Sequence, residues 1–437
     1  MNTKKTITKV SEKDQSESIN SSLVKRYQIV RELTETLCKP LATEDYVIQS
    51  MPDVSPTKWH LAHTSWFFET FILNKVNKHY KSLHPQYNYL FNSYYVQVGK
   101  RHFRPERGLL SRPTVEEVYS YRHHVDQHML EFLEKANQAH MEEIAPVIEI
   151  GLNHEQQHQE LILTDIKHVF SVNPLRPVYL HIKHDSPRPF TIPEMRWVRF
   201  PEAAYWIGHD GNGFAFDNES PRHKVYLNSF KLAYRLVTNR EYLAFIEDGS
   251  YERPELWLSD GWYTVEANDW KAPLYWEKGD RHWWYFTLSG MREVDLDEPV
   301  THVSYYEADA YARWKGVKLP SESEWEIASS KLPIEGNFVE SGNFHPRTLN
   351  QDSTNRGLLQ MFGDVWEWTQ SPYIPYPGFK TLPGALGEYN GKFMSNQMVL
   401  RGGSCATSMS HIRKTYRNFF PPHARWQFMG IRLAKDE

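Results

Sequence analysis

Apolar side chains in the first part of the chain recur every three or four residues, the spacing that places them on one face of an α-helix. Residues 23–37, 59–67, 115–132 and 147–161 show this pattern. Ser55 and Pro56 precede the second segment, as expected for an N-cap followed by proline in the first helical turn. Connections of varied length separate the segments. We therefore predict an antiparallel four-helix bundle in residues 23–182.

The pattern changes near residue 185. Residues 183–190 are rich in proline and polar side chains and are typical of a linker. Beyond them, short apolar runs alternate with scattered glycine, proline and tryptophan. Helices are expected at 306–315 and at 321–329, where Ser321 and Glu324 have the spacing of a capping box. We predict a mixed α+β domain in residues 191–437, and hence an α+β multidomain chain.

Composition narrows the class of protein. The 437 residues carry 50 Lys and Arg against 54 Asp and Glu, so the net charge gives no reason to expect a nucleic-acid or membrane partner. No apolar run approaches the roughly 18 residues of a membrane-spanning helix. Residues 1–22 are rich in Lys, Ser and Glu, which predicts a disordered tail rather than a secretory signal. Two cysteines make no disulfide framework, so we expect a cytoplasmic protein.

The strongest local pattern is a pair of histidines four residues apart, His154 and His158, in the fourth predicted helix. Residues at this spacing share one helix face, so both imidazoles can reach one metal ion. Both interrupt an apolar stripe, and an unpaired buried imidazole is costly. His63 lies on the apolar stripe of another predicted helix and can supply a third ligand. The alternative is a set of core histidines that only form hydrogen bonds.

The spacing alone does not choose the metal. A zinc peptidase would use the same five residues, with Glu155 as its general base. Three neutral histidines would leave the cation its full charge and some open coordination positions. Such a site suits zinc with a bound water, or a non-haem iron that binds substrate and dioxygen together.

Further blocks of sequence resemble known families. The N-terminal half resembles the DinB-like helical domain. The C-terminal half resembles the formylglycine-generating-enzyme (sulfatase-modifying factor) domain, which implies a C-type-lectin-like fold. The two domains in this order resemble the ergothioneine-biosynthesis sulfoxide synthases, iron enzymes that join a thiol to hercynine (N-trimethylhistidine) with dioxygen. The blocks of the second resemblance are residues 218–223, 237–242, 299–304, 319–326, 363–368, 401–404 and 430–433.

The resemblance implies a particular set of iron(II) ligands. They are His63 in the segment Leu-Ala-His, together with His154 and His158. His60 lies three residues before His63 and could compete for the first position. Gln157 matches a residue that contacts the substrate imidazole in the family.

The resemblance also implies roles for tyrosines and arginines. Tyr94 and Tyr95 match paired tyrosines that would serve bound oxygen, because a phenol can donate a proton or a hydrogen bond there. Arg104 and Arg107 resemble arginines that hold the thiol substrate, and we expect them to bind the cysteine carboxylate. Ordinary packing of the tyrosines and a solvated basic loop are the non-functional alternatives.

A late segment of the C-terminal domain corresponds to the family's hercynine-contacting loop. Asn418, Phe419 and Phe420 occupy it, and aromatic faces attract a trimethylammonium group. Relatives that use γ-glutamylcysteine carry an Asp and an Arg where this chain has Phe420 and Ala424. We therefore expect free cysteine as the thiol substrate, since the charges of a glutamyl group would lack partners. The neighbouring residues His423 and Arg425 could supply other contacts.

Several rival functions share parts of this pattern. Formylglycine generation needs a pair of active-site cysteines, and Cys38 lies in the helical half while Cys405 lies in the other. An ovothiol-type synthase often carries an added methyltransferase domain, for which we expect no room here. A selenoneine-type synthase shares the architecture. A zinc hydrolase and a metal-free binding module are the remaining alternatives, and the sequence does not indicate the oligomeric state.

Overall fold

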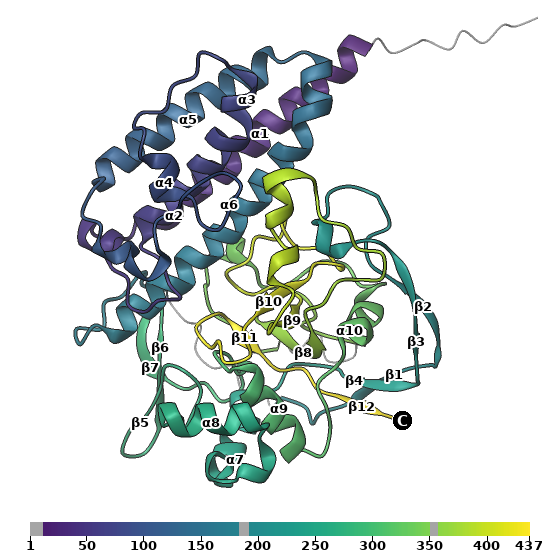
Figure 1. Cartoon of the computed structure of the whole chain (residues 1–437). Coiled ribbons are helices and arrows are strands. Elements are labelled where there is room, and N and C mark those ends of the chain that lie inside the picture. The colour runs from purple at the N-terminus through teal and green to yellow at the C-terminus, as the bar shows by residue number, and fades with distance from the viewer. Residues whose placement is uncertain (1–11, 183–191, 350–356) are drawn as a thin grey trace, which may run out of the picture. The chain divides into compact units, whose positions relative to one another are not determined.

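The computed structural model describes residues 12–182, 192–349 and 357–437, with backbone alone for residues 12–20 (Figure 1). The chain divides into two compact units, Met1–Gln159 and Glu160–Glu437. The predicted linker and residues 1–11 of the predicted tail lie outside the described residues. Residues 12–22 are helical, because the first helix begins at Glu12.

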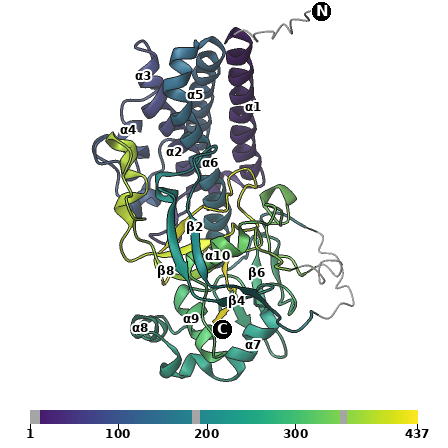
Figure 2. The same ribbon diagram turned by 90° about the vertical axis from the view of Figure 1, so that its right-hand side faces the viewer.

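Four long helices build the first unit, as the periodicity predicts: α1 (Glu12–Cys38), α2 (Thr57–Phe68), α5 (Val115–Lys135) and α6 (Gln138–Val172). They run alongside one another, as Figures 1 and 2 show. A π-helical turn (Glu69–Leu73) and α3 (Asn74–Val76) follow α2, and α4 (Tyr87–Phe91) lies in the connection to α5. Short 3₁₀ turns cover Thr43–Val47 and Arg104–Leu109.

The helix starts show where local sequence decides the boundary. Thr114 caps α5: its hydroxyl accepts from the Glu117 N–H at 3.1 Å, and the Glu117 carboxylate accepts from the Thr114 N–H at 2.6 Å. The predicted cap of α2 is wrong. Pro56 itself occupies the N-cap position without a side-chain bond, and the Ser55 hydroxyl accepts instead from Arg107 at 2.9 Å.

Helix α2 is the centre of the bundle, since all twelve of its residues are buried. It approaches α6 closely at Gly151, where a Cβ atom would stand 2.6 Å from the Phe68 ring. A glycine at this position therefore lets two helices pack tightly. This contact lies one turn before His154 and brings the histidine-bearing parts of α2 and α6 together.

The second unit is a mixed α+β domain, as expected, and its described residues form four small sheets. Their strand orders are β1-β4-β12, β10-β9-β8-β11, β2-β3 and β5-β6-β7, and β8–β11 is a parallel pair. The strands are β1 (Trp197–Phe200), β2 (Ala203–Ile207), β3 (His223–Leu227), β4 (Phe230–Ala233), β5 (Trp276–Lys278), β6 (Trp283–Thr287), β7 (Gly290–Glu293), β8 (Trp366–Pro372), β9 (Met398–Arg401), β10 (Asn418–Phe420), β11 (Met429–Gly430) and β12 (Ala434–Asp436).

Four short helices accompany these sheets. The two predicted ones are α9 (Tyr305–Trp314) and α10 (Glu322–Ser329), and Ser321 and Glu324 form the expected capping box. The other two are α7 (Asn239–Glu247) and α8 (Ser259–Asn268). Across the described parts of the chain, no helix has the length and apolar character needed to cross a membrane.

Candidate metal centre

Three histidines of the first unit meet at one point. His63 of α2 and His154 and His158 of α6 each offer a ring nitrogen, and these nitrogens lie within 4.8 Å of one another. All three side chains are buried. The four-residue spacing on α6 places two of them on one face, and the close packing at Gly151 brings the third from α2.

The hydrogen bond of His63 fixes which of its nitrogens is open. Its Nδ1 lies 2.5 Å from the Phe91 carbonyl oxygen, so this nitrogen carries the proton and donates it. The lone pair is then on Nε2, which is buried and has no hydrogen-bond partner among the described residues. An orphaned lone pair of this kind fits a metal ion.

The protonation state of the cluster also fits a metal. Burial lowers the pKa of His154 to about 3, and burial together with the neighbouring imidazoles holds the pKa of His63 and His158 well below the ordinary value. The three rings are therefore neutral near pH 7. Neutral imidazoles are ready to coordinate without first losing a proton.

His60 contacts the cluster rather than joining it. Its Nδ1 lies 2.8 Å from Nδ1 of His158, so one of these two nitrogens donates to the other. Because this bond occupies His158 Nδ1, it leaves Nε2 of His158 for a metal. The geometry thus places His60 as the hydrogen-bond partner of a ligand, a role that orients metal-binding histidines in other sites.

Aromatic rings fix His63 from both sides. The Trp59 ring stacks on one face at 4.5 Å and 15°, and the Trp66 ring on the other at 5.4 Å and 15°. The Arg107 guanidinium lies over the far side of Trp59, 3.3 Å from the ring centre. This cation–π contact places a positive charge near the histidines, where it also lowers the pKa of His63 and His158.

The two predicted carboxylate-binding arginines differ in their surroundings. Arg107 is buried and donates to Ser55 at 2.9 Å and to Ser93 at 3.3 Å. Arg104 is exposed and donates to the main-chain oxygen of Asp53. Only Arg107 therefore lies in the aromatic stack beside the histidines.

The predicted pair of tyrosines forms a unit close to the cluster. The rings of Tyr94 and Tyr95 stack at 4.6 Å, and their hydroxyl oxygens lie 3.5 Å apart. Asn92 holds this turn, since its side-chain amide donates to the main-chain carbonyl oxygen of Tyr95 at 2.9 Å and its Oδ1 accepts from the Tyr95 N–H at 3.1 Å. Tyr95 is buried against Trp66 at 5.6 Å, so a single ring separates it from His63.

Glu155 points away from the histidines. One of its oxygens accepts from Arg31 at 2.9 Å, and the other from Arg122 at 3.0 Å and from Thr34 at 2.7 Å. Burial would raise the pKa of this carboxyl, but the two guanidinium groups outweigh burial and lower it. A carboxylate held this way is not placed to activate a metal-bound water, which argues against the zinc peptidase interpretation. The remaining predicted residue on α6, Gln157, is half-buried.

The predicted hercynine contacts of the second unit lie on β10. Asn418 and Phe420 share one face of this strand, because side chains alternate. Phe419 lies on the other face and stacks on Tyr373 at 4.0 Å and 8°. Phe420 meets Trp426 edge-on at 5.7 Å. The structure therefore divides the predicted trio between two faces.

Arg425, one of the two residues near Ala424 that could contact a glutamyl group, already has a charged partner within the protein. Ala424 is buried, and His423 is exposed. Arg425 forms an ion pair with Glu307 at 3.2 Å and lies over the Trp270 ring. Its charge is therefore already matched within the protein.

Both cysteines are buried and free. Burial raises the pKa of Cys38 to about 12 and that of Cys405 well above its ordinary value, so both remain thiols. Cys38 belongs to the first unit and Cys405 to the second. The second unit thus has no pair of cysteines for formylglycine chemistry.

Sequence reasoning missed the side chains that support the site. Trp59 lies in the apolar segment 59–67, whose spacing predicts only packing, and no motif in the sequence singles out Arg31 or Arg122. One pattern could have revealed Arg31, since it lies four residues after Tyr27 and three before Thr34, on the buried face of α1. The Phe91 carbonyl carries no such pattern, because any residue supplies a carbonyl.

A buried cluster of three neutral imidazoles in a helical bundle, joined to an α+β domain, defines a class of metal-dependent enzyme. Two family models cover these parts. The DinB superfamily model matches residues 26–162, and the sulfatase-modifying factor enzyme 1-like domain model matches residues 192–437.

One curated relative is similar over both parts, and two others are similar over about half of this chain. The hercynine oxygenase of Mycolicibacterium smegmatis is 31% identical over 420 residues, which cover 89% of this chain and 92% of that protein. The hercynine oxygenase of Mycobacterium tuberculosis is 37% identical over 242 residues, covering 51% of this chain and 56% of that protein. Ergothioneine biosynthesis protein 1 of Schizosaccharomyces pombe is 29% identical over 51% of this chain and 28% of that protein. This chain belongs to the hercynine oxygenase family and is an oxygenase.

Proposed function

We propose that this protein is a non-haem iron(II) sulfoxide synthase that uses dioxygen to join cysteine to hercynine, in ergothioneine biosynthesis. The observation that carries the proposal is the cluster of His63, His154 and His158 in a chain that aligns with a hercynine oxygenase along 89% of its length. The names of the relatives support hercynine as the substrate and ergothioneine as the end product of the pathway.

The three histidines would hold iron(II) through neutral imidazole nitrogens, with His63 using Nε2. Iron(II) bound there would supply open positions for substrate and dioxygen and would carry electrons from the substrates to dioxygen. The overall reaction removes the imidazole C–H hydrogen and the thiol hydrogen and forms the C–S bond. One oxygen atom remains on sulfur as the sulfoxide, and the other leaves with the two hydrogens as water.

The chain's own residues would bind and orient the substrates. We assign the cysteine carboxylate to Arg107, with Arg104 as a weaker second contact, because the Arg107 guanidinium is buried in the aromatic stack that contains His63. Gln157 would contact the hercynine imidazole. Asn418, Phe419 and Phe420 would receive the trimethylammonium end, an assignment that the family resemblance supports.

Tyr94 and Tyr95 would donate a proton or hydrogen bond to the reacting oxygen. The contact between their hydroxyls supports a shared role, since one phenol can supply its neighbour. Replacing both with phenylalanine should lower sulfoxide formation about 10²-fold or more, while the KM values for both substrates change little. Steady-state kinetics with product analysis measures both. Unchanged turnover would remove the catalytic role.

Free cysteine is the proposed thiol substrate. The aromatic Phe420 and the buried Ala424 stand where a γ-glutamyl group would need a charged pair, and Arg425 is already paired with Glu307. Buried polar groups without partners discriminate strongly between substrates. The buried, unpaired thiols of Cys38 and Cys405 support a reducing compartment, the cytoplasm, as the place of action.

Oxygen consumption combined with mass analysis of the products tests the proposal. The iron(II)-loaded protein receives hercynine with cysteine, and in parallel hercynine with γ-glutamylcysteine, unmethylated histidine with cysteine, and hercynine with a selenium donor. A hercynine–cysteine sulfoxide formed fastest from free cysteine is the expected result. No oxygen uptake with any pair would refute the oxygenase proposal, and a faster alternative pair would reassign the substrate.

A matched pair of variants tests the ligands. His158→Ala should abolish iron retention and oxygen uptake, whereas His140→Ala should retain both, because His140 lies exposed near the start of the same helix. Bound iron per chain after desalting is the readout. A His158→Ala variant that keeps iron and full turnover would overturn the ligand assignment.

A further inference from the structure

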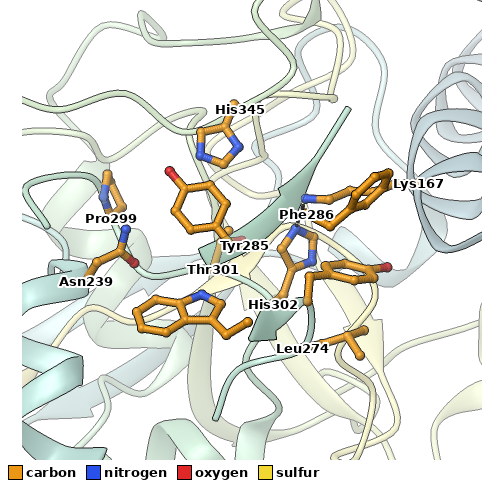
Figure 3. A pocket seen from close by; sticks show the side chains of 11 residues that line it. Lys167, Asn239, Leu274, Tyr285, Phe286, Pro299, Thr301, His302 and His345 are labelled. Atoms are coloured by element: carbon orange, nitrogen blue, oxygen red, sulfur yellow. Dashed lines mark hydrogen bonds between the residues drawn. The ribbon is translucent and has the colours of Figure 1, made fainter. Parts of the chain in front are cut away.

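The second unit contains a small cavity, and one of its lining residues, Lys167, lies on α6 nine residues after His158. Figure 3 shows its lining, in which Lys167 and His302 face the aromatic ring of Tyr285, with Thr301 and His345 nearby. Tyr275 also lines it. The cavity has room for about one water molecule. All of these residues belong to the second unit.

Lys167 places a buried amine at this cavity. Its Nζ lies 2.7 Å from Nε2 of His302 and, among the described residues, takes part in no ion pair within 4.0 Å. His302 Nδ1 lies 3.3 Å from the Arg425 carbonyl oxygen, so Nδ1 carries the proton and Nε2 accepts from Lys167. A buried ammonium without a carboxylate is costly, and the amine is therefore favoured in its neutral form.

The charges around Lys167 agree with this state. Burial lowers the pKa of Lys167 to about 7, and Arg292 lowers it as well, while Glu298 acts in the opposite direction. The rings of Tyr275 and Phe428 lie 4.9 Å and 4.7 Å from Nζ. At pH 7 a large part of the population thus has a lone pair on Nζ, which makes it a nucleophile.

Polar atoms without partners also line this cavity. The hydroxyls of Tyr275 and Thr301 and Nδ1 of His345 are buried and have no hydrogen-bond partner in the described structure. The other nitrogen of His345 contacts Glu298 at 2.9 Å, so Nδ1 is left as an acceptor. Buried polar groups normally have partners, and three such atoms around one cavity indicate a ligand.

The backbone around the cavity is strained at two positions. Tyr275 and His302 adopt φ values of 75° and 63°, in the left-handed region that residues other than glycine and asparagine rarely occupy. Such strain persists where the surrounding structure holds it, and it concentrates at functional sites.

We propose that this cavity is a second ligand site, which takes an uncharged one-carbon aldehyde that condenses with the Lys167 amine. The amine nitrogen attacks the carbonyl carbon, a C–N bond forms, and the carbonyl oxygen takes up a proton. That oxygen then leaves as water together with the two hydrogens of the amine, and a neutral imine remains. His302 Nε2 is placed to relay an amine proton, and Thr301 and Tyr275 offer hydroxyls to the carbonyl oxygen.

The walls of the cavity favour an aldehyde over carbon dioxide. Condensation with carbon dioxide would leave an anionic carbamate among aromatic rings, close to Glu298, and burying that charge would be costly. The imine carries no charge. Its size also agrees with the limited space.

Reductive methylation of the full-length protein tests the proposal. The protein is treated with limiting formaldehyde and cyanoborohydride, which reduces each imine to a methylamine, and peptide mass spectrometry measures the rate at every lysine. At pH 7 Lys167 should react at least about ten-fold faster than the exposed Lys135, because an exposed lysine has a pKa near 10.4 and is almost wholly protonated. This advantage should shrink as the pH approaches 10. Equal or slower labelling of Lys167 at pH 7 would overturn the proposal.

Three controls separate the cavity from an ordinary reactive lysine. In 8 M urea the advantage of Lys167 should vanish, and an advantage that persisted there would contradict a site built by the fold. Thr301→Val keeps the side-chain shape and removes the hydroxyl, and it should slow Lys167 labelling several-fold. Lys271→Met removes a highly exposed amine and should leave the Lys167 rate unchanged. An unchanged rate in Thr301→Val would refute the role of the hydroxyl in binding the carbonyl.

Discussion

His60 is not a predicted metal ligand, but its contact with His158 should affect the affinity of the site for iron(II). Partners that fix the orientation of a metal-binding histidine typically contribute 10–100-fold to affinity. We therefore expect His60→Ala to weaken iron(II) binding by about 10–100-fold, without the complete loss expected for His158→Ala. Titration of the metal-free protein with iron(II) against a competing chelator measures the difference.

A conservative variant separates orientation from packing. His60→Gln retains a group that can hydrogen-bond to His158 Nδ1, so it should recover part of the affinity that His60→Ala loses. Equal losses in both variants would indicate that the ring of His60 acts only by filling space. Wild-type affinity in His60→Ala would contradict the orienting role.

At the scale of single residues, the sequence predicts those site residues whose placement depends only on local helix geometry. The spacing of His154 and His158 requires only that the segment be helical, and the three histidines do meet. The stack of Arg107 on Trp59 could not be read in this way, because residues 48 positions apart are joined by tertiary packing. Asn418 and Phe420 lie on one face of β10 and Phe419 on the other. This placement requires the segment to form a strand paired with β9, and that pairing is also non-local.

The helix that carries two histidines is tied to its neighbours through Glu155. This carboxylate joins α6 to Arg31 of α1 and Arg122 of α5. Glu155→Gln should destabilise the bundle by about 3–5 kcal/mol at pH 7, because it leaves buried guanidinium groups without their counter-charge. Urea unfolding followed by circular dichroism measures the loss. Glu143→Gln, at an exposed position of the same helix, should change stability by less than about 0.5 kcal/mol.

The same carboxylate predicts a pH dependence. Folding lowers the pKa of Glu155 below its ordinary value of 4.5. Its contribution to stability is therefore complete above about pH 4.5 and is lost as the pH falls through the lower value of the folded state. The difference in unfolding free energy between wild type and Glu155→Gln should shrink as the pH falls below 4.5. A difference that stays constant across this range would contradict the assignment.

Long helices and two of the capped helices were predictable from the sequence, and the short strands were not. The long helices of the bundle are predicted by apolar residues three or four positions apart, and α9 and α10 begin with capping boxes that span four residues. Helix α7 was overlooked, although Thr238 and Glu241 form the same capping box. Strands of two to five residues, such as β11 and β2, are too short for an alternating pattern to stand out.

Metal binding should stabilise the protein as a whole. A ligand that binds only the folded state contributes about 2.7 kcal/mol at 100 times its dissociation constant. Removing iron with a chelator should therefore lower the thermal midpoint measured by helical circular dichroism, and restoring iron(II) should recover it. The chelator should have no such effect on His158→Ala. An identical shift in that variant would place the stabilising metal elsewhere.

The division of the chain between Gln159 and Glu160 falls inside α6, which runs unbroken from Gln138 to Val172. The expected boundary was a linker some twenty residues later. A helix forms cooperatively, so a cut within it costs more than the bond that is broken. A chain divided into two polypeptides at this point would have both new ends inside one helix. Separate expression of the two halves should therefore leave α6 whole only where the cut lies beyond Val172.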